Sequence, residues 1–100
     1  MTTATAAVSL DSLNPATGEV VGSVPLTAVG EIPAVVASAK KAAKSWAAMT
    51  AQQRADIIRP AGARLVERAE ELGELLSREQ GKPIPEGIGE VRGCGARTSD

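Results

Sequence analysis

The sequence predicts an α/β fold in which an N-terminal β-hairpin is followed by amphipathic helices. Two apolar runs that carry β-branched residues flank a dense turn segment near the N-terminus, which is typical of a hairpin. After residue 30 the apolar residues recur at steps of three and four, which is the period of one helix face. Each such face needs a covering layer, and one hairpin is too small to supply it. We therefore expect an incomplete fold whose covering sheet is absent from this sequence.

The hairpin is expected to span residues 8–26. Its strands are Val8 to Leu13 and Glu19 to Leu26, both with apolar residues in an extended pattern. Gly22 is expected to mark a bulge. Pro25 favours an edge strand or the end of a strand, because proline cannot donate a hydrogen bond to a neighbouring strand.

A helix is expected at residues 31–49, with Thr27 or Gly30 capping its start. Pro33 suits the first turn, where its missing N–H group would have no partner. Trp46 is expected to be a core plug at the end of this helix. The apolar stripe consists of Ile32, Val35, Val36, Ala39, Ala43 and Trp46. The opposite face carries Lys40, Lys41 and Lys44, which we interpret as a solvated face rather than an anion site.

A helical pair is expected at residues 51–80, with Thr50 as the N-cap of its first helix. Pro60 is expected to kink that helix or to delay its start to about Arg59, because proline removes an internal hydrogen bond. The apolar stripe of the pair consists of Ile58, Ala61, Gly62, Leu65, Ala69, Leu72 and Leu76.

Two glycines and a proline are expected to punctuate the second half of the chain. Gly73 is expected to divide the helical pair, and Gly81 is expected to end it in a left-handed conformation before Pro83. Residues 84–92 are expected to start a further helix. Residues 93–100 lose the apolar period, so we expect an irregular tail produced by truncation or a frameshift. Residues 1–7 are rich in Thr and Ala without a period, and we expect a disordered N-terminus.

The composition bounds the class of protein. One hundred residues allow one small domain, and 18 of its 43 apolar residues are alanine, which leaves 25 larger ones for a core. The net charge of −1 argues against a nucleic-acid surface, which needs a basic stripe. No apolar run reaches the length of a membrane span, and the first ten residues lack the pattern of a secretory signal. A single cysteine fits a reducing cytosol, so we expect a cytoplasmic protein.

Several segments resemble the aldehyde dehydrogenase family in their order and spacing. Asn14-Pro15-Ala16-Thr17-Gly18-Glu19 resembles the turn that opens many members, and Gln53-Arg54-Ala55 resembles the second helix. Glu79-Gln80-Gly81-Lys82-Pro83, followed by Gly89-Glu90-Val91, resembles the segment that closes the helical pair. The sequence of that closing segment is most similar to the succinate-semialdehyde dehydrogenase branch. The resemblance covers about residues 10–93.

The resemblance implies oxidation of an aldehyde to a carboxylic acid with NAD or NADP. In that family a cysteine thiolate attacks the carbonyl, amides hold the oxyanion, hydride passes to the nicotinamide, and a glutamate activates water. The family segments for these steps lie downstream of the matched region. The resemblance therefore assigns no catalytic, cofactor-binding or metal-binding residue here. It implies instead a scaffold that belongs to the Rossmann-like dinucleotide-binding domain of a homo-oligomeric enzyme, and a chain that is inactive by itself.

Other residues carry functional hypotheses that the sequence disfavours. Cys94 has no histidine partner, since the chain contains no histidine. Gly87 to Gly93 superficially resembles a dinucleotide fingerprint, but Lys82-Pro83-Ile84-Pro85 precedes it instead of a strand. Gly81-Lys82 lacks the following Ser or Thr of a phosphate-binding loop. The acidic residues Glu70, Glu71, Glu74 and Glu79 lack the companions of a metal site.

A second hypothesis, from another class, stays open at this point. The chain would be a small helical interaction module without catalytic activity, which docks its apolar stripes on a partner or on a second copy. It predicts a cooperative fold whose melting temperature depends on protein concentration.

Overall fold

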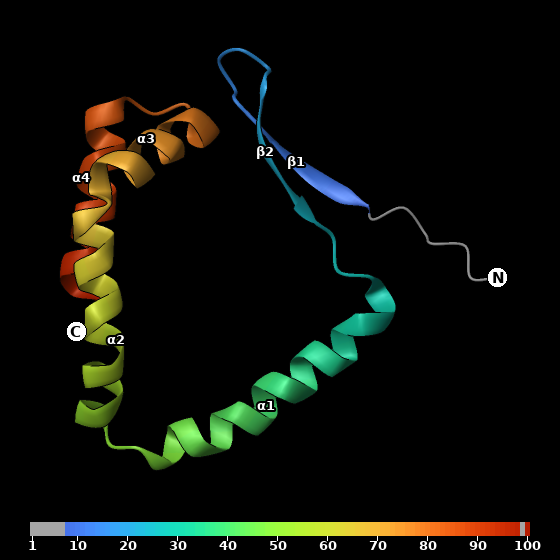
Figure 1. Ribbon diagram of the computed structural model, residues 1–100, viewed down its shortest axis with the longest axis vertical. Helices are drawn as coiled ribbons and strands as arrows, with labels where there is room; N and C mark the ends of the chain where they lie inside the picture. Colours follow the sequence, from blue (N-terminus) through green and yellow to red (C-terminus); the bar gives the residue numbers. More distant parts are fainter. Residues whose placement is uncertain (1–7, 99) are drawn as a thin grey trace.

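The computed structural model describes residues 8–98 and 100, and it confirms the predicted α/β composition. The elements are β1 (Ser9–Leu13), β2 (Val20–Pro25), a 3-10 turn η1 (Val29–Glu31), α1 (Ile32–Ala48), α2 (Ala51–Glu67), α3 (Ala69–Gln80) and α4 (Ile84–Arg97). Figure 1 shows α1 extending away from the group that α2, α3 and α4 form, with the hairpin nearest to α3. The predicted disordered segment, residues 1–7, lies outside the described residues.

The turn between β1 and β2 is closed by its own polar groups. Asn14 Oδ1 accepts a hydrogen bond from the backbone N–H of Ala16 at 2.9 Å, and the Asn14 carbonyl accepts from Gly18 N–H at 2.7 Å. Gly18 has φ +77°, a left-handed conformation that costs glycine nothing because it has no Cβ. Thr17 Oγ1 accepts from the N–H of Glu19 at 3.2 Å. The polar residues of the family-like turn therefore have local structural roles.

The pairing of β1 with β2 slips by one residue near the turn. Ser12 pairs with Gly22, whereas Leu13 pairs with Val20, so Val21 falls between two paired positions. One extra residue in one strand of an antiparallel pair is a β-bulge. The bulge predicted at Gly22 thus lies at the residue before it.

The start of α1 differs from the prediction. Pro33 lies in the first turn as expected, but no side chain caps the helix, so neither Thr27 nor Gly30 has the predicted role. Instead, η1 precedes the helix, and its Glu31 carboxylate accepts a hydrogen bond from the N–H of Ala28 at 3.2 Å. A carboxylate is favourable there because free N–H groups give the helix start a partial positive charge.

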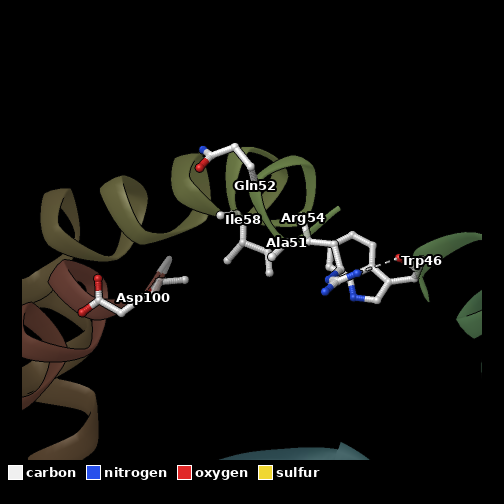
Figure 2. A pocket seen from close by; sticks show the side chains of 8 residues that line it. Trp46, Ala51, Gln52, Arg54, Ile58 and Asp100 are labelled. Atoms are coloured by element: carbon white, nitrogen blue, oxygen red, sulfur yellow. Dashed lines mark hydrogen bonds between the residues drawn. The ribbon is translucent and has the colours of Figure 1, made fainter. Parts of the chain in front are cut away.

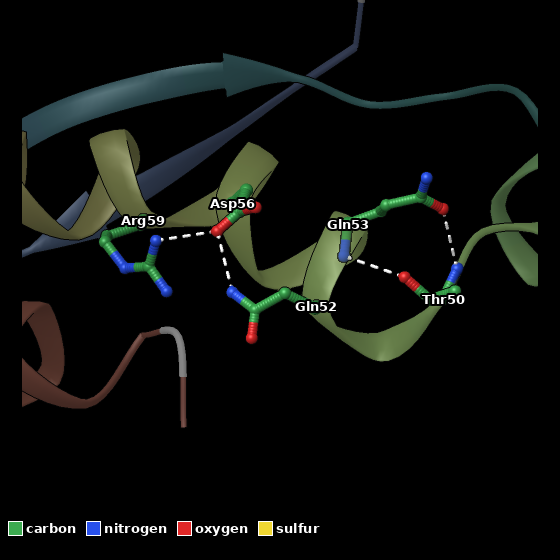
Figure 3. Close-up of polar contacts among 5 residues, drawn as sticks. All are labelled: Thr50, Gln52, Gln53, Asp56 and Arg59. Atoms are coloured by element: carbon green, nitrogen blue, oxygen red, sulfur yellow. Dashed lines mark hydrogen bonds and ion pairs between the residues drawn. The ribbon is translucent and has the colours of Figure 1, made fainter.

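Thr50 and Gln53 form a reciprocal cap at the start of α2 (Figure 3). Thr50 Oγ1 accepts from Gln53 N–H at 3.2 Å, and Gln53 Oε1 accepts from Thr50 N–H at 2.9 Å. Each side chain thus satisfies an N–H group that a helix start leaves without an internal partner. The predicted N-cap is confirmed.

Pro60 does not delay the start of α2, and that part of the prediction was wrong. The helix runs from Ala51 to Glu67 with Pro60 inside it. Proline within a helix costs about 3 kcal/mol, which here is opposed by the reciprocal cap and by the packing of α2 against α4. The proline is exposed, so its ring does not occupy the face that contacts α4.

The helical pair divides at Arg68 and not at Gly73. Arg68 has φ −98° and ψ 15°, and its guanidinium donates two hydrogen bonds to the carboxylate of Glu71, at 2.8 and 3.1 Å. Gly73 lies inside α3 and is buried. The missing Cβ of Gly73 therefore serves packing and does not interrupt the helix.

The helix α4 corrects the prediction of an irregular tail at residues 93–100. It runs from Ile84 to Arg97, and Thr98 Oγ1 donates to the carbonyl of Cys94 at 2.7 Å beyond its last turn. Each glycine in a helix costs about 1 kcal/mol relative to alanine, which is why a glycine-rich segment predicts no helix. Tertiary contact overrides this cost, because α4 packs on both α2 and α3.

Four glycines form the contact of α4 with α2 and α3, and we call Gly62, Gly73, Gly87 and Gly95 the glycine seam. A Cβ on Gly95 would lie 2.6 Å from the carbonyl oxygen of Gly62, and one on Gly87 would lie 2.4 Å from that of Gly73. Real Cβ atoms do not approach so closely, so the helix backbones touch at two places. Small residues also make up the whole buried set among the described residues: Gly62, Ala69, Gly73, Ser77 and Gly87.

Candidate functional site

The apolar stripe of α1 is uncovered in the described part of the chain. No residue of α1 is buried, and the side chains of Ile32, Val35 and Val36 are 46%, 57% and 51% exposed. Such a stripe on a 17-residue helix is about 25 Å long at 1.5 Å per residue. Within the described residues, 8–98 and 100, no layer covers this stripe, as expected.

The dimensions of the molecule agree with uncovered surface. Its radius of gyration is 18.1 Å, whereas a compact domain of 100 residues has about 13 Å. Its accessible surface is 7901 Å², whereas a folded monomer of 10.2 kDa has about 5,300 Å². None of the helices in residues 8–98 is long and apolar enough to cross a membrane.

A groove of about 440 Å³ lies where α1 ends and α2 begins (Figure 2). Its apolar lining includes Trp46, Ile58 and Ala55. Arg54 also lines the groove, and its side chain reaches the end of α1. Arg54 Nη1 donates to the carbonyl of Met49 at 2.6 Å and to that of Trp46 at 3.5 Å. Trp46 stands at the helix end as predicted, but it is 37% exposed and is not a core plug within this chain.

A second groove, of about 530 Å³, lies between the hairpin and α3. Leu10 and Val24 line it from the strands, and Leu75 and Glu79 line it from α3. The hairpin turn also lies against the end of α3, because Pro15 Cγ would lie 2.9 Å from a Cβ placed on Gly81. The family-like turn and the family-like helix stop therefore meet in space, although about 60 residues separate them in sequence.

Cys94 lies on α4 and is exposed. A nucleophilic cysteine needs a neighbouring base or cation to form its thiolate. The residues that line the shallow hollow around it include Glu90, Arg97 and Thr98. Within residues 8–98, no three acidic or cysteine side chains gather as metal ligands would. A carboxylate and a guanidinium thus line the same hollow as the Cys94 thiol.

The residues of Gly87 to Gly93 do not fit a dinucleotide phosphate. They lie within α4, where Gly87 N–H donates to the carbonyl of Pro83 at 3.1 Å and Gly87 itself packs on Gly73. Lys82, next to the helix stop, forms an ion pair with Glu90. Gly87 is therefore engaged in helix packing, and the ammonium group of Lys82 is engaged in an ion pair.

The charged residues singled out in the sequence lie on exposed helix faces. All three lysines of α1 are exposed. Glu71 pairs with Arg68 at 2.8 Å, and Glu70 lies 3.8 Å from Arg92 of α4. Exposed pairs of this kind contribute little to stability, so these residues orient helices only weakly.

Two exposed ion pairs are expected to add a small part of the chain's stability that is lost in acid. Hydrogen bonds from Arg59 and Gln52 lower the pKa of Asp56 (Figure 3), and the hydrogen bonds from Arg68 lower the pKa of Glu71. A lowered folded-state pKa adds stability above the unfolded value of about 4, and this stability is lost as pH falls. We expect the urea concentration at the unfolding midpoint to fall as the pH is lowered from 5 to 2. The fall should be smaller in a double variant, Asp56→Asn with Glu71→Gln, than in the unmodified chain, as measured by circular dichroism at low salt.

The matched control is Glu74→Gln, because Glu74 lies on α3 and forms none of the ion pairs found among the described residues. This control should keep the full acid dependence of the unmodified chain. An equal reduction in the control and the double variant would contradict the assignment of acid sensitivity to these two pairs.

Comparisons with known proteins identify the source of this architecture. A family model described as the aldehyde dehydrogenase family matches residues 2–98. The chain is 41% identical over 78 residues to the glutarate-semialdehyde dehydrogenase of Pseudomonas aeruginosa, which covers 78% of this chain and 16% of that protein. The chain thus spans less than a fifth of the length of the relative it matches. The turn and the helix stop that resemble the family are accounted for in the structure, and Gln53 of the family-like second helix takes part in the cap of α2. The chain belongs to the aldehyde dehydrogenase family.

Proposed function

We propose that the chain is the N-terminal scaffold of an enzyme that oxidises an aldehyde to a carboxylic acid with NAD or NADP. The aldehyde belongs to the semialdehydes of short dicarboxylic acids. The chain's own task is to lay the α1 stripe and the hairpin against the dinucleotide-binding domain of that enzyme.

The observation that carries this proposal is the uncovered stripe of α1 on a chain that the family model matches almost throughout. Burial of a large apolar side chain stabilises a protein by about 1.5 to 3 kcal/mol, so this stripe favours association with a covering layer. The semialdehyde class is supported by the name of the relative, a glutarate-semialdehyde dehydrogenase, and by the sequence Glu79-Gln80-Gly81-Lys82-Pro83.

The proposal assigns no catalytic, cofactor-binding or metal-binding residue to the chain. The residues present do not fit a dinucleotide, since the glycine-rich segment is inside α4. The thiolate nucleophile, the amides for the oxyanion and the nicotinamide therefore belong to the rest of the enzyme. We further propose a cytoplasmic homo-oligomer that has no nucleic-acid or membrane partner. The net charge of −1 supports the lack of a nucleic-acid partner, the single cysteine supports a reducing compartment, and the family resemblance supports the homo-oligomer.

A chimera tests the proposal. The 78 matched residues of the Pseudomonas aeruginosa enzyme are replaced by those of this chain, and reduction of NAD or NADP is followed by absorbance with glutarate or succinate semialdehyde. We expect the chimera to keep activity and the 100-residue chain alone to show none. Separate assays with the two cofactors and the two semialdehydes decide which pair is preferred.

The control is the same chimera with Gly87→Leu, which disrupts the glycine seam and should lower the yield of assembled enzyme. A folded but inactive chimera would contradict the scaffold role. Cofactor reduction by the chain alone would contradict the assignment of all catalytic groups to other segments.

The exposed stripe also favours one other function, a helical interaction module that docks on a partner or a second copy. Such a module would melt cooperatively, and its melting temperature would rise with protein concentration. Sedimentation and thermal melts of the chain over a wide concentration range separate the two functions. A disordered circular dichroism spectrum of the isolated chain would exclude the module.

A further inference from the structure

We infer that Arg54 fixes the orientation of α1 relative to α2 through its hydrogen bonds to the end of α1, and we call this contact the clasp. The α1 helix, which we call the arm, then holds its apolar stripe in one orientation before it meets a covering layer. The inference concerns the geometry of the chain itself, and it does not rest on the proposed function. Arg54, which is half-buried, thereby has a conformational role.

The helix α1 makes few contacts with the other elements of the described chain. Among the elements of the described chain, α1 mainly contacts η1, the single turn that directly precedes it. Between α1 and α2 stand two residues, Met49 and Thr50, both in extended conformation with ψ 152° and 160°. Rotation about these few backbone bonds would change the orientation of the whole helix. Because α1 has 17 residues, a small change in this angle would displace its N-terminal end by a long distance.

Arg54 opposes this rotation from the first turn of α2. Its Nη1 donates to the Met49 carbonyl at 2.6 Å in a half-buried position and reaches the Trp46 carbonyl at 3.5 Å. The Met49 N–H also donates to the Trp46 carbonyl, at 3.2 Å. Arg54 therefore contacts two carbonyls, one in the last turn of α1 and one in the residue after it. A cation is favourable at this end, where carbonyls without partners give the helix a partial negative charge.

The planar guanidinium suits this task better than an ammonium group would. Its fork presents several N–H donors in fixed directions, and less side-chain freedom is lost for each hydrogen bond it forms. Lysine would keep the charge but not the fixed directions. A preoriented arm lowers the ordering cost when its stripe docks on a covering layer.

A distance measurement tests the clasp in the 100-residue chain. Spin labels are placed on Cys94, the natural and exposed cysteine of α4, and on Ser38→Cys, an exposed position of α1 outside its stripe. We expect one narrow distance in the unmodified chain, loss of that narrow distance in Arg54→Ala, and an intermediate width in Arg54→Lys. Circular dichroism should show equal helix content in all of them.

The matched control is Arg59→Ala, because Arg59 is also on α2 but hydrogen-bonds only Asp56 of the same helix. It should leave the distance narrow. Equal widths in the unmodified chain and Arg54→Ala would overturn the inference, and so would equal broadening in Arg59→Ala. If Arg54→Ala loses helix content, Arg54→Gln decides: a narrow distance in Arg54→Gln overturns the role of the guanidinium, and a broad one supports it.

Discussion

Gly87→Ala should destabilise the chain by about 2 to 3 kcal/mol, the upper range for forcing an extra methyl group into a packed contact. The added Cβ would lie 2.4 Å from the Gly73 carbonyl oxygen and 2.5 Å from Ser77 Oγ. A side chain could rotate away, but the carbonyl belongs to the backbone of α3. The helices α3 and α4 would therefore have to separate. Urea unfolding followed by helix circular dichroism measures the loss.

Gly73, which faces α4 from α3 in the glycine seam, gives a similar prediction. A Cβ on Gly73 would lie 2.4 Å from Ile88 Cα and 2.5 Å from its nitrogen, so Gly73→Ala should cost a similar amount. The double variant, Gly73→Ala with Gly87→Ala, should cost less than the sum of the two, because either methyl group alone already separates the helices.

Gly89→Ala is the matched control on the same helix. A Cβ there meets nothing within 4 Å, and alanine is favoured over glycine in a helix by about 1 kcal/mol. This variant should be neutral or slightly stabilising. If Gly87→Ala and Gly89→Ala behaved alike, close backbone contact would not be what holds α4 in place.

The sequence predicted the elements whose signals are local. The hairpin followed from two apolar runs around a turn whose groups bond to one another within six residues, from Asn14 to Glu19. The start of α2 followed from Thr50, because a cap involves only residues three apart. The family resemblance rested on these same segments and was confirmed by the comparison.

The features that escaped prediction depend on residues distant in sequence. Gly73 was expected to divide a helix, and residues 93–100, which include Gly95, were expected to be irregular because the apolar period is lost there. The benefit of these two glycines comes from α4 meeting α2 and α3, more than ten residues away. A signal was present in the spacing of Gly87 and Gly95, eight residues apart, which places both near one helix face. The role of Arg54 also needed the structure, since its partners are carbonyls of the preceding helix.

The candidate site shows the same division. The apolar stripe of α1 was predicted residue by residue from its period, and its exposure confirms that nothing in the described chain covers it. The sequence could not predict the two grooves, because each is lined by segments that meet only in the folded chain. It also placed Trp46 in a core, since the sequence cannot show whether a covering layer is within reach of an aromatic side chain.

Gly81→Ala should give the second large loss of stability, of about 2 kcal/mol, with two separate causes. Gly81 ends α3 with φ +80°, and a left-handed conformation costs a residue with a Cβ about 1 to 2 kcal/mol. The added Cβ would also lie 2.9 Å from Pro15 Cγ, so the hairpin turn would have to move away from the helix stop. Urea unfolding measures the total loss.

A second glycine separates the two causes. Gly18 has nearly the same conformation, with φ +77°, but a Cβ on it would meet nothing within 4 Å. Gly18→Ala should therefore cost the conformational part alone, and the excess of Gly81→Ala over it measures the contact with Pro15. Gly30→Ala, with open space and no positive φ, should cost neither part. Equal losses of stability for Gly18→Ala and Gly81→Ala would show that the contact between the hairpin turn and the helix stop does not contribute to stability. In that case the docking of the hairpin would depend on the α3 side of the second groove, where Leu75 and Glu79 face the strands.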